Sequence, residues 1–256
     1  MSVESSFAPV VLFLSGLVSM LYATFSGGGA LLTLPALIFV GAAPATAVAA
    51  NRFAIFIQSF VRFPFLHGKL NIGLKIPGLL VSVHAAGAII GSLILVSLES
   101  SVSLPILGIV LIIGAIVTLV SPKGATPAQK REITAIPILI SSACVLATGI
   151  YRGFFGPAAG IFNRLIFVQF LRLDFTQSLV LSNYSTILSS LAALIVFFNS
   201  GIVDMGLALP LTAGTVIGAF FGTKFALEKG NEFMKYAFVA LSALAGIYFI
   251  FTGLGK

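Results

Sequence analysis

The chain has 256 residues, of which 59% are hydrophobic and only 8% are charged. Its mean hydropathy is +1.15, whereas an average soluble domain is about half apolar and about a quarter charged. This composition excludes a soluble enzyme and a disordered chain, and a single cysteine, Cys144, excludes an internal disulfide framework. The apolar runs are continuous rather than alternating, which argues against a transmembrane β-barrel. The sequence therefore predicts an all-α, polytopic membrane protein.

Stretches without charge show where the chain is expected to cross the bilayer, because a spanning helix needs about 20 apolar residues. The glycines at 27–29 divide the first such stretch, 5–51, into two segments. The expected segments, in chain order, are 7–25, 29–41, 44–66, 71–97, 102–121, 134–151, 156–171, 175–200, 205–227 and 233–254. Segments 29–41 and 156–171 are too short to span comfortably, so we expect each to be a short discontinuous helix.

A polar, proline-containing stretch at 122–132 lies at the middle of the chain, and we expect it to be a linker. The two transmembrane halves, 1–121 and 133–256, carry weakly similar motifs in the same order. The matched positions are Asn51 and Asn183, Gly73 and Gly206, and Pro77 and Pro210. With about five segments per half, an odd number, the halves must have opposite orientations. The sequence thus predicts two inverted repeats, as in many secondary transporters.

The basic residues predict the orientation, because short loops rich in Lys and Arg mark the cytoplasmic side. Most of the 14 basic residues fall on the side of the linker, and only Lys256 falls on the other side. The residues on the linker side are Arg62, Lys69, Lys75, Lys123, Lys130, Arg131, Arg172, Lys224, Lys229 and Lys235. We therefore expect a multi-pass protein of the cell (inner) membrane with linker 122–132 in the cytoplasm. This bias explains most of the net charge of +7, so nucleic acid is not an expected partner.

Three further basic residues, Arg52, Arg152 and Arg164, lie inside or at the edge of apolar segments. A charge inside the bilayer costs about 2.5–3.5 kcal/mol on insertion scales, which makes such a residue a functional candidate. The alternative is that each side chain snorkels or pairs with a helix-end carbonyl. Arg52 follows the repeat-matched Asn51, and Arg152 precedes GFFGP, so a binding role is favoured for these two.

Two breaks in the expected helices accompany these arginines. Ser26 followed by three glycines is typical of a break with an N-cap, and Gly156-Pro157 is typical of a helix with proline at its first position. Helix N-termini inside a transporter bind anions through free N–H groups and the helix dipole. The alternative is that the glycines only permit close packing, as in the GxxxG pairs Gly87/Gly91 and Gly218/Gly222. The expected substrate-binding residues are Ser26, Gly27, Gly28, Gly29, Asn51, Arg52, Arg152, Gly156, Pro157 and Asn183.

Two blocks of the chain resemble the sulfite exporter TauE/SafE family. The first is SGGGALLTLPALIFVGAAPATAVAANR at 26–52, which resembles the family's Gly-run, VPAL-like stretch, G-x-x-P turn and A-T-N-K-like end. The second is GIYRGFFGPAAGIFNRLIFV at 149–168, similar to the family's G-x-Y-D-G-F-F-G-P-G-x-G block, and SNYSTI at 182–187 resembles the helix that follows. Arg52 stands where the family usually has Lys, and Arg152 where it has Asp. The resemblance implies transport of small sulfur-containing anions such as sulfite or organosulfonates.

The distribution of titratable groups constrains the mechanism. All seven acidic residues lie near segment ends, so a carboxylate proton relay is not expected. His84 is the one intramembrane group that titrates near neutrality, either as a packed neutral histidine or as a proton carrier. We expect export of a small anion by alternating access around a midplane site. Proton-coupled uptake through His84 and a passive anion channel remain the alternatives.

The sequence contains no motif for catalysis, metal ligation or cofactor binding. HExxH, CxxC and Walker sequences are absent, and no Ser-His-Asp set is plausible. We therefore expect no enzyme activity, no metal and no cofactor. The expected partners are a small anionic substrate and the lipid bilayer.

Overall fold

The computed structural model describes residues 7–26, 30–66, 68, 70, 75–120, 135–226, 247, 250 and 251. Within these ranges the regular structure is entirely α-helical. The helices are α1 (Ala8–Ser26), α2 (Ala30–Phe39), α3 (Pro44–Leu66), α4 (Lys75–Ser97), α5 (Ser100–Val120), α6 (Ala135–Phe154), α7 (Ala159–Leu171), α8 (Phe175–Asn199) and α9 (Met205–Ala226). Their bounds agree with the expected segments to within a few residues. The expected linker 122–132 and most of segment 233–254 lie outside the described residues.

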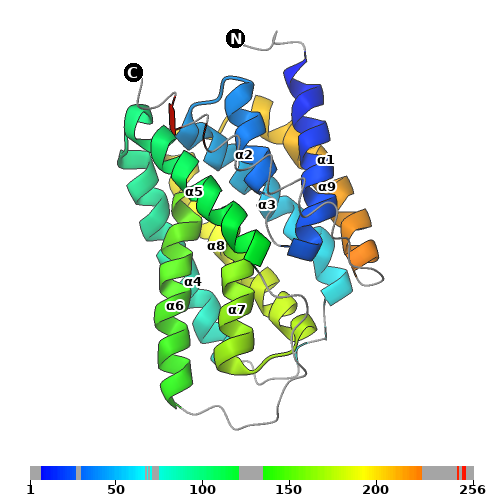
Figure 1. The fold of residues 1–256 in the computed structure, drawn as a ribbon, viewed down its shortest axis with the longest axis vertical. Helices are drawn as coiled ribbons and strands as arrows, with labels where there is room; N and C mark the ends of the chain where they lie inside the picture. Colours follow the sequence, from blue (N-terminus) through cyan, green and yellow to red (C-terminus); the bar gives the residue numbers. More distant parts are fainter. Residues whose placement is uncertain are drawn as a thin grey trace.

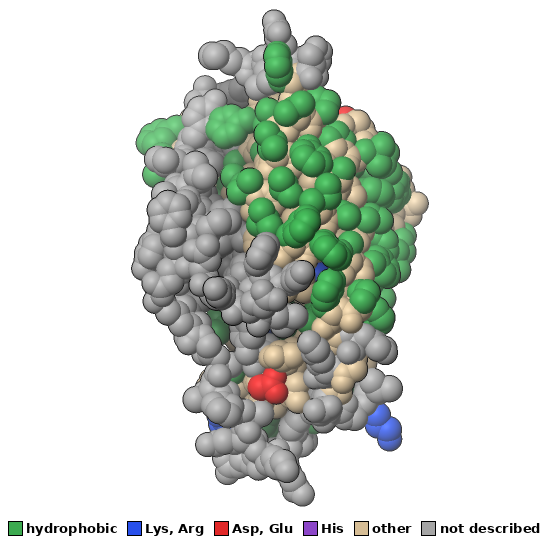
Figure 2. Space-filling model, turned by 90° about the vertical axis from the view of Figure 1, so that its right-hand side faces the viewer, with side chains coloured by type: hydrophobic (Ala, Val, Ile, Leu, Met, Phe, Trp, Pro, Cys, Tyr) green, Lys and Arg blue, Asp and Glu red, His purple; other side chains and the backbone are tan. Residues whose placement is uncertain are grey.

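The surface of the helices is apolar, as the composition predicted. Four described helices are long and apolar enough to cross a membrane: Lys75–Ser97, Ile136–Phe154, Thr176–Asn199 and Met205–Thr223. Large apolar side chains point outward from them; Leu93 is 54% exposed and Ile195 is 56% exposed. Figure 2 shows hydrophobic side chains covering the upper described part of one face, on which charged side chains are sparse. An apolar surface of this extent marks contact with lipid, which confirms an all-α integral membrane protein.

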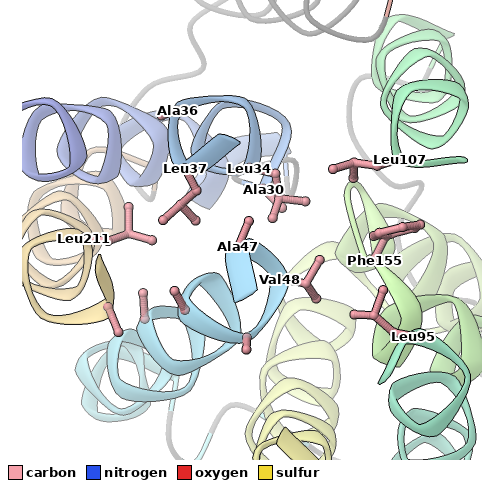
Figure 3. Packing of buried hydrophobic residues seen from close by; sticks show 14 of the residues in the cluster. Ala30, Leu34, Ala36, Leu37, Ala47, Val48, Leu95, Leu107, Phe155 and Leu211 are labelled. Atoms are coloured by element: carbon pink, nitrogen blue, oxygen red, sulfur yellow. The ribbon is translucent and has the colours of Figure 1, made fainter. Parts of the chain in front are cut away.

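The short helices α2 and α7 pack against the longer helices; α2 is mostly buried, whereas Leu165 of α7 is 38% exposed. They have 10 and 13 residues, and at about 1.5 Å per residue neither reaches across a hydrocarbon layer of about 30 Å. Leu31, Leu34 and Leu37 of α2 are fully buried. Figure 3 shows Leu37 directed toward Ala47 of α3 and Leu211 of α9. The prediction of a short helix in each half is therefore confirmed.

The start of α7 differs from the prediction that Pro157 is its first helical residue. The helix begins at Ala159, and Pro157 lies in the preceding turn. Gly156 and Ala158, on either side of the proline, have φ values of 77° and 60°. These left-handed conformations are incompatible with a right-handed helix, so the helix starts only after them. The hydroxyl of Tyr151 donates a hydrogen bond to the carbonyl of Pro157 and helps to hold the turn.

Glycines bring two pairs of helices into backbone contact: α1 with α9, and α4 with α6 (Figure 1). A Cβ atom at Gly91 would collide with the carbonyl oxygen of Ile150, and one at Gly218 with that of Leu17. Because backbone atoms cannot move aside cheaply, these positions require glycine. The predicted packing role of such glycines is confirmed at these sites. Between the two pairs, α3 packs against both α8 and α9, and α8 packs against α4.

Candidate functional site

A polar cavity opens between helices α1, α2, α3, α6, α7 and α8. It contains about 570 Å³ of space not filled by atoms, part of which is open solvent. Its described lining residues are Met20, Ala23, Ala30, Ile55, Gln58, Arg62, Arg152, Gly156, Gly160, Arg164, Leu179, Ser182, Asn183 and Thr186. Most of its residues come from the two central helices, α3 and α8, and from the α6–α7 junction. The cavity therefore lies where the two halves of the chain meet.

Three arginines line this cavity: Arg62 from α3, Arg152 from α6 and Arg164 from α7. Arg152 is 6% exposed and Arg164 is 8% exposed, so their guanidinium groups are largely shielded from bulk solvent. No Asp or Glu occurs among the lining residues that the structure describes. Opposite charges attract strongly in a low-dielectric environment. A lining with three cationic groups and no anionic one therefore favours a negatively charged occupant.

The acidic side chains of the described ranges lie away from the cavity, at the beginnings of helices. Asp174 caps α8 by accepting a hydrogen bond from the backbone N–H of Gln177 at 2.7 Å. Asp204 accepts one from the N–H of Gly206 at 2.8 Å. These contacts are the ordinary N-capping role of aspartate.

Arg62 is one of the basic residues that predict the cytoplasmic side, and the structure puts it in the cavity wall, a role that the sequence does not predict. Ile55, Gln58 and Arg62 lie at positions i, i+3 and i+7 of α3, so they share one face of the helix. In the same way, Leu179, Ser182 and Thr186 share a face of α8. In α3, Gln58 and Arg62 are polar residues on one face of a largely apolar helix. This pattern is the sequence signal that could have identified Arg62 as a cavity residue.

The N-terminal ends of both short helices reach the cavity. Ala30 is the first residue of α2 and Gly160 is the second residue of α7, and both line the cavity. The positive end of the helix dipole is located at such ends. At α7 the N–H groups of Ala159, Ile161 and Phe162 donate to carbonyls of the preceding turn, so the dipole is the main contribution of this end. Gly156 also lines the cavity, whereas Pro157 does not. The expected Gly27, Gly28 and Gly29 lie outside the described residues, and Ser26 is the last residue of α1 rather than the residue before α2.

Arg52 lies behind the cavity wall instead of in it. Its side chain is 1% exposed, and its Nη2 donates a hydrogen bond to the main-chain carbonyl of Arg152. Its Nε has no hydrogen-bond partner among the described residues. The structure thus brings the two expected arginines together, with only Arg152 facing the cavity.

The repeat-matched asparagines have different surroundings. Asn51 is 1% exposed and does not line the cavity; its Oδ1 accepts a hydrogen bond from the hydroxyl of Thr33 at 2.7 Å. Asn183 lines the cavity, and its Nδ2 donates to the carbonyl of Ser59 at 3.3 Å. The Oδ1 of Asn183 has no partner within the described ranges. Asn183 is therefore positioned to contact a bound molecule, and Asn51 is positioned to hold α2 on α3.

His84 is fully buried in α4 and lies outside the cavity lining. Its Nε2 is 2.9 Å from Nδ2 of Asn163. The hydroxyl of Thr148 donates to Oδ1 of Asn163 at 2.6 Å, which directs the amide nitrogen toward the histidine. Nε2 accepts from this amide when the imidazole is the neutral tautomer with its proton on Nδ1. The geometry favours a packing role for His84 over proton transfer.

Comparison with known proteins agrees with this architecture. Residues 12–249 match the family model of the sulfite exporter TauE/SafE family. The chain belongs to this family. It is 28% identical to the probable membrane transporter protein YfcA of Escherichia coli (strain K12), over 96% of this chain and 91% of the relative. It is 27% identical to the probable membrane transporter protein ORF9 of Sinorhizobium sp, over 94% of this chain and 90% of the relative.

A third relative, a probable membrane transporter protein of Haemophilus influenzae, is 24% identical over 91% of this chain and 90% of its own length. No solved structure matches the chain significantly. The family and these relatives are membrane transporters rather than enzymes. The protein is accordingly a membrane transporter, with a small-molecule substrate and a lipid environment.

Proposed function

We propose that this protein is a secondary transporter of a small anion, which exports sulfite or an organosulfonate by alternating access. The observation that carries the proposal is the cavity lined by Arg62, Arg152 and Arg164, with no carboxylate in its described lining. Guanidinium groups bind oxyanions through paired, charge-assisted hydrogen bonds. The N-termini of α2 and α7 add dipoles that favour negative charge at the same place.

The composition of the lining supports this substrate class. The lining has polar side chains, such as Ser182 and Asn183, besides the arginines, and it also has apolar side chains, such as Ile55 and Leu179. An oxyanion group suits the polar side chains, and a short hydrocarbon chain suits the apolar ones. The cavity therefore suits an organosulfonate as well as inorganic sulfite.

The packing of the helices supports an inverted-repeat mechanism. If the two halves are equivalent, α1 corresponds to α6 and α4 corresponds to α9. The contact of α1 with α9 then has its counterpart in the contact of α6 with α4, and both pairs meet through glycines. The short helices α2 and α7 follow α1 and α6 in the same order. Rocking of one repeat against the other around a central site is how many such transporters expose their substrates alternately.

The proposed orientation has linker 122–132 in the cytoplasm of the cell, with the protein in the inner membrane. It rests on the Lys and Arg residues of the connecting segments, which the positive-inside rule assigns to the cytoplasmic side. With this orientation, the negative potential of the cell interior drives an anion outward. This force is worth about 2.3 kcal/mol per charge per 100 mV, so export needs no coupled proton.

Transport by purified protein in liposomes tests the proposal. Vesicles loaded with radiolabelled sulfite should show saturable efflux that accelerates when unlabelled sulfite is present outside. The substitution Arg164→Gln should abolish most of this flux. Lys75→Gln removes an equal charge from an exposed position at the start of α4, and it should leave the flux unchanged. Single-channel currents would contradict alternating access. The absence of flux for sulfite, sulfoacetate and thiosulfate alike would contradict the substrate class.

A further inference from the structure

Arg52 connects two parts of the chain that are far apart in sequence. It belongs to α3, in the first half, and its Nη2 donates to the main-chain carbonyl of Arg152 in the last turn of α6, in the second half. Carbonyls in the last turn of a helix have no partner within the helix. They also form the negative end of the helix dipole, where a cation is stabilising. The guanidinium of Arg52 therefore caps the C-terminus of α6.

Gly156 provides the space for this contact. A Cβ atom at Gly156 would lie 2.9 Å from Nη2 of Arg52 and 2.9 Å from the carbonyl oxygen of Arg152. Both distances are shorter than a normal contact, so any larger residue would displace the guanidinium. The positive φ of Gly156, 77°, also suits glycine at this point. The hydrogen bond and the absence of a side chain at Gly156 thus belong to one contact at the α6–α7 junction.

Asn51, which precedes Arg52 in α3, makes a contact with the first short helix. Asn51 accepts the hydroxyl hydrogen of Thr33, which is in α2. Consecutive residues of α3 therefore hold the first short helix and the junction that leads into the second. Both short helices have their N-terminal ends at the cavity, so α3 sets the position of each.

We infer that Arg52 is a positioning residue that clamps the α6–α7 junction and does not touch the anion. The clamp holds the side chain of Arg152 and the N-terminus of α7, at Gly160, against the cavity. This inference rests on the proposed function, and it corrects the expectation that Arg52 itself binds substrate. It follows from the 1% exposure of Arg52 and from its place behind the lining.

Two variants separate a positioning role from a binding role. Arg52→Gln removes the clamp, whereas Arg152→Gln removes a cavity side chain but keeps the carbonyl that Arg52 contacts. We expect both to weaken sulfite binding about tenfold: Arg152→Gln because a charged group is lost from the lining, and Arg52→Gln because Arg152 and the start of α7 lose their position. In ligand-free protein, only Arg52→Gln should accelerate hydrogen–deuterium exchange of the backbone amides at 153–160. A residue that acts solely as an anion ligand would leave this exchange unchanged.

Two further variants keep the test decisive if Arg52→Gln does not fold. Arg52→Met keeps a long side chain that cannot donate to the carbonyl, so it should accelerate the same exchange. Arg52→Lys keeps a cation able to donate to the carbonyl, and it should restore most of the binding and protection. Weaker binding with unchanged exchange, in either Arg52→Gln or Arg52→Met, would overturn the inference, as would faster exchange with normal binding. The exchange measurement needs no substrate, so it distinguishes failure of the clamp from failure of the proposed function.

Discussion

Nδ2 of Asn163 in α7 lies 2.9 Å from Nε2 of His84 in α4, and both side chains are fully buried. Thr148 of α6 completes this chain of hydrogen bonds by donating to Oδ1 of Asn163 at 2.6 Å. The chain joins three helices beside the cavity. A buried polar group that loses its partner destabilises the fold by about 1–3 kcal/mol. Removing one side of this contact should therefore lower the thermal stability of the protein.

We predict that His84→Leu lowers the thermal stability of the protein, because it leaves Nδ2 of Asn163 without an acceptor. The expected loss is about 1–3 kcal/mol, observed as a lower Tm. His84→Gln offers a carbonyl acceptor and should lose less. Transport by His84→Gln should also keep the pH dependence of the wild type between about pH 6 and 8. Loss of proton-driven flux in this variant would instead assign His84 a role in proton coupling.

Arg62 should contribute to anion binding although it lies near the end of α3. We predict that Arg62→Gln lowers the affinity for sulfite about tenfold, because a charge-assisted hydrogen bond is lost from the cavity lining. A titration with sulfite that follows the Tm measures this effect, since a ligand of the native state raises the Tm. Lys75→Gln is the matched control, and equal affinities for the two variants would rule out a binding role for Arg62.

Two glycines of α4 should respond in opposite ways to the same substitution. Gly91→Ala places a methyl group against the carbonyl of Ile150 in α6, so it should separate the helices and lower the Tm. At Gly78, a Cβ atom meets nothing within 4 Å among the described residues. Gly78→Ala should therefore be neutral or stabilising, by up to about 1 kcal/mol from helix propensity. A similar loss of Tm in both variants would refute close packing as the reason for Gly91.

Ala158 has a left-handed backbone conformation, with φ at 60°, immediately before α7. Such a conformation costs a residue with a Cβ atom about 1–2 kcal/mol relative to glycine. We predict that Ala158→Gly raises the Tm, although greater freedom of the unfolded chain offsets part of the gain. Calorimetry of the two proteins in the same detergent checks this, and a lower Tm for Ala158→Gly would mean that the turn carries no strain.

The positions of the helices follow closely from the sequence, because the signals that define them are local. A run of apolar residues identifies a segment that must be buried in lipid or protein, and the expected segment 44–66 coincides with α3. The motif GFFGP likewise marks the interruption between α6 and α7. Its detailed geometry does not follow from the motif: Gly156 and Ala158 have positive φ values, so α7 starts only at Ala159.

The composition of the cavity depends on contacts between helices that are distant in sequence. The sequence by itself determined an all-α membrane protein with two short helices, because hydropathy and chain breaks act over neighbouring residues. Only the tertiary structure decided that Arg62 lines the cavity while Arg52, which is 1% exposed, lies behind it. The tertiary structure also gave the two repeat-matched asparagines different places, with Asn183 in the cavity lining and Asn51 outside it. The physical reason is that the face a helix turns toward a cavity is set by its packing against α8, α9 and the short helices, which no single segment encodes.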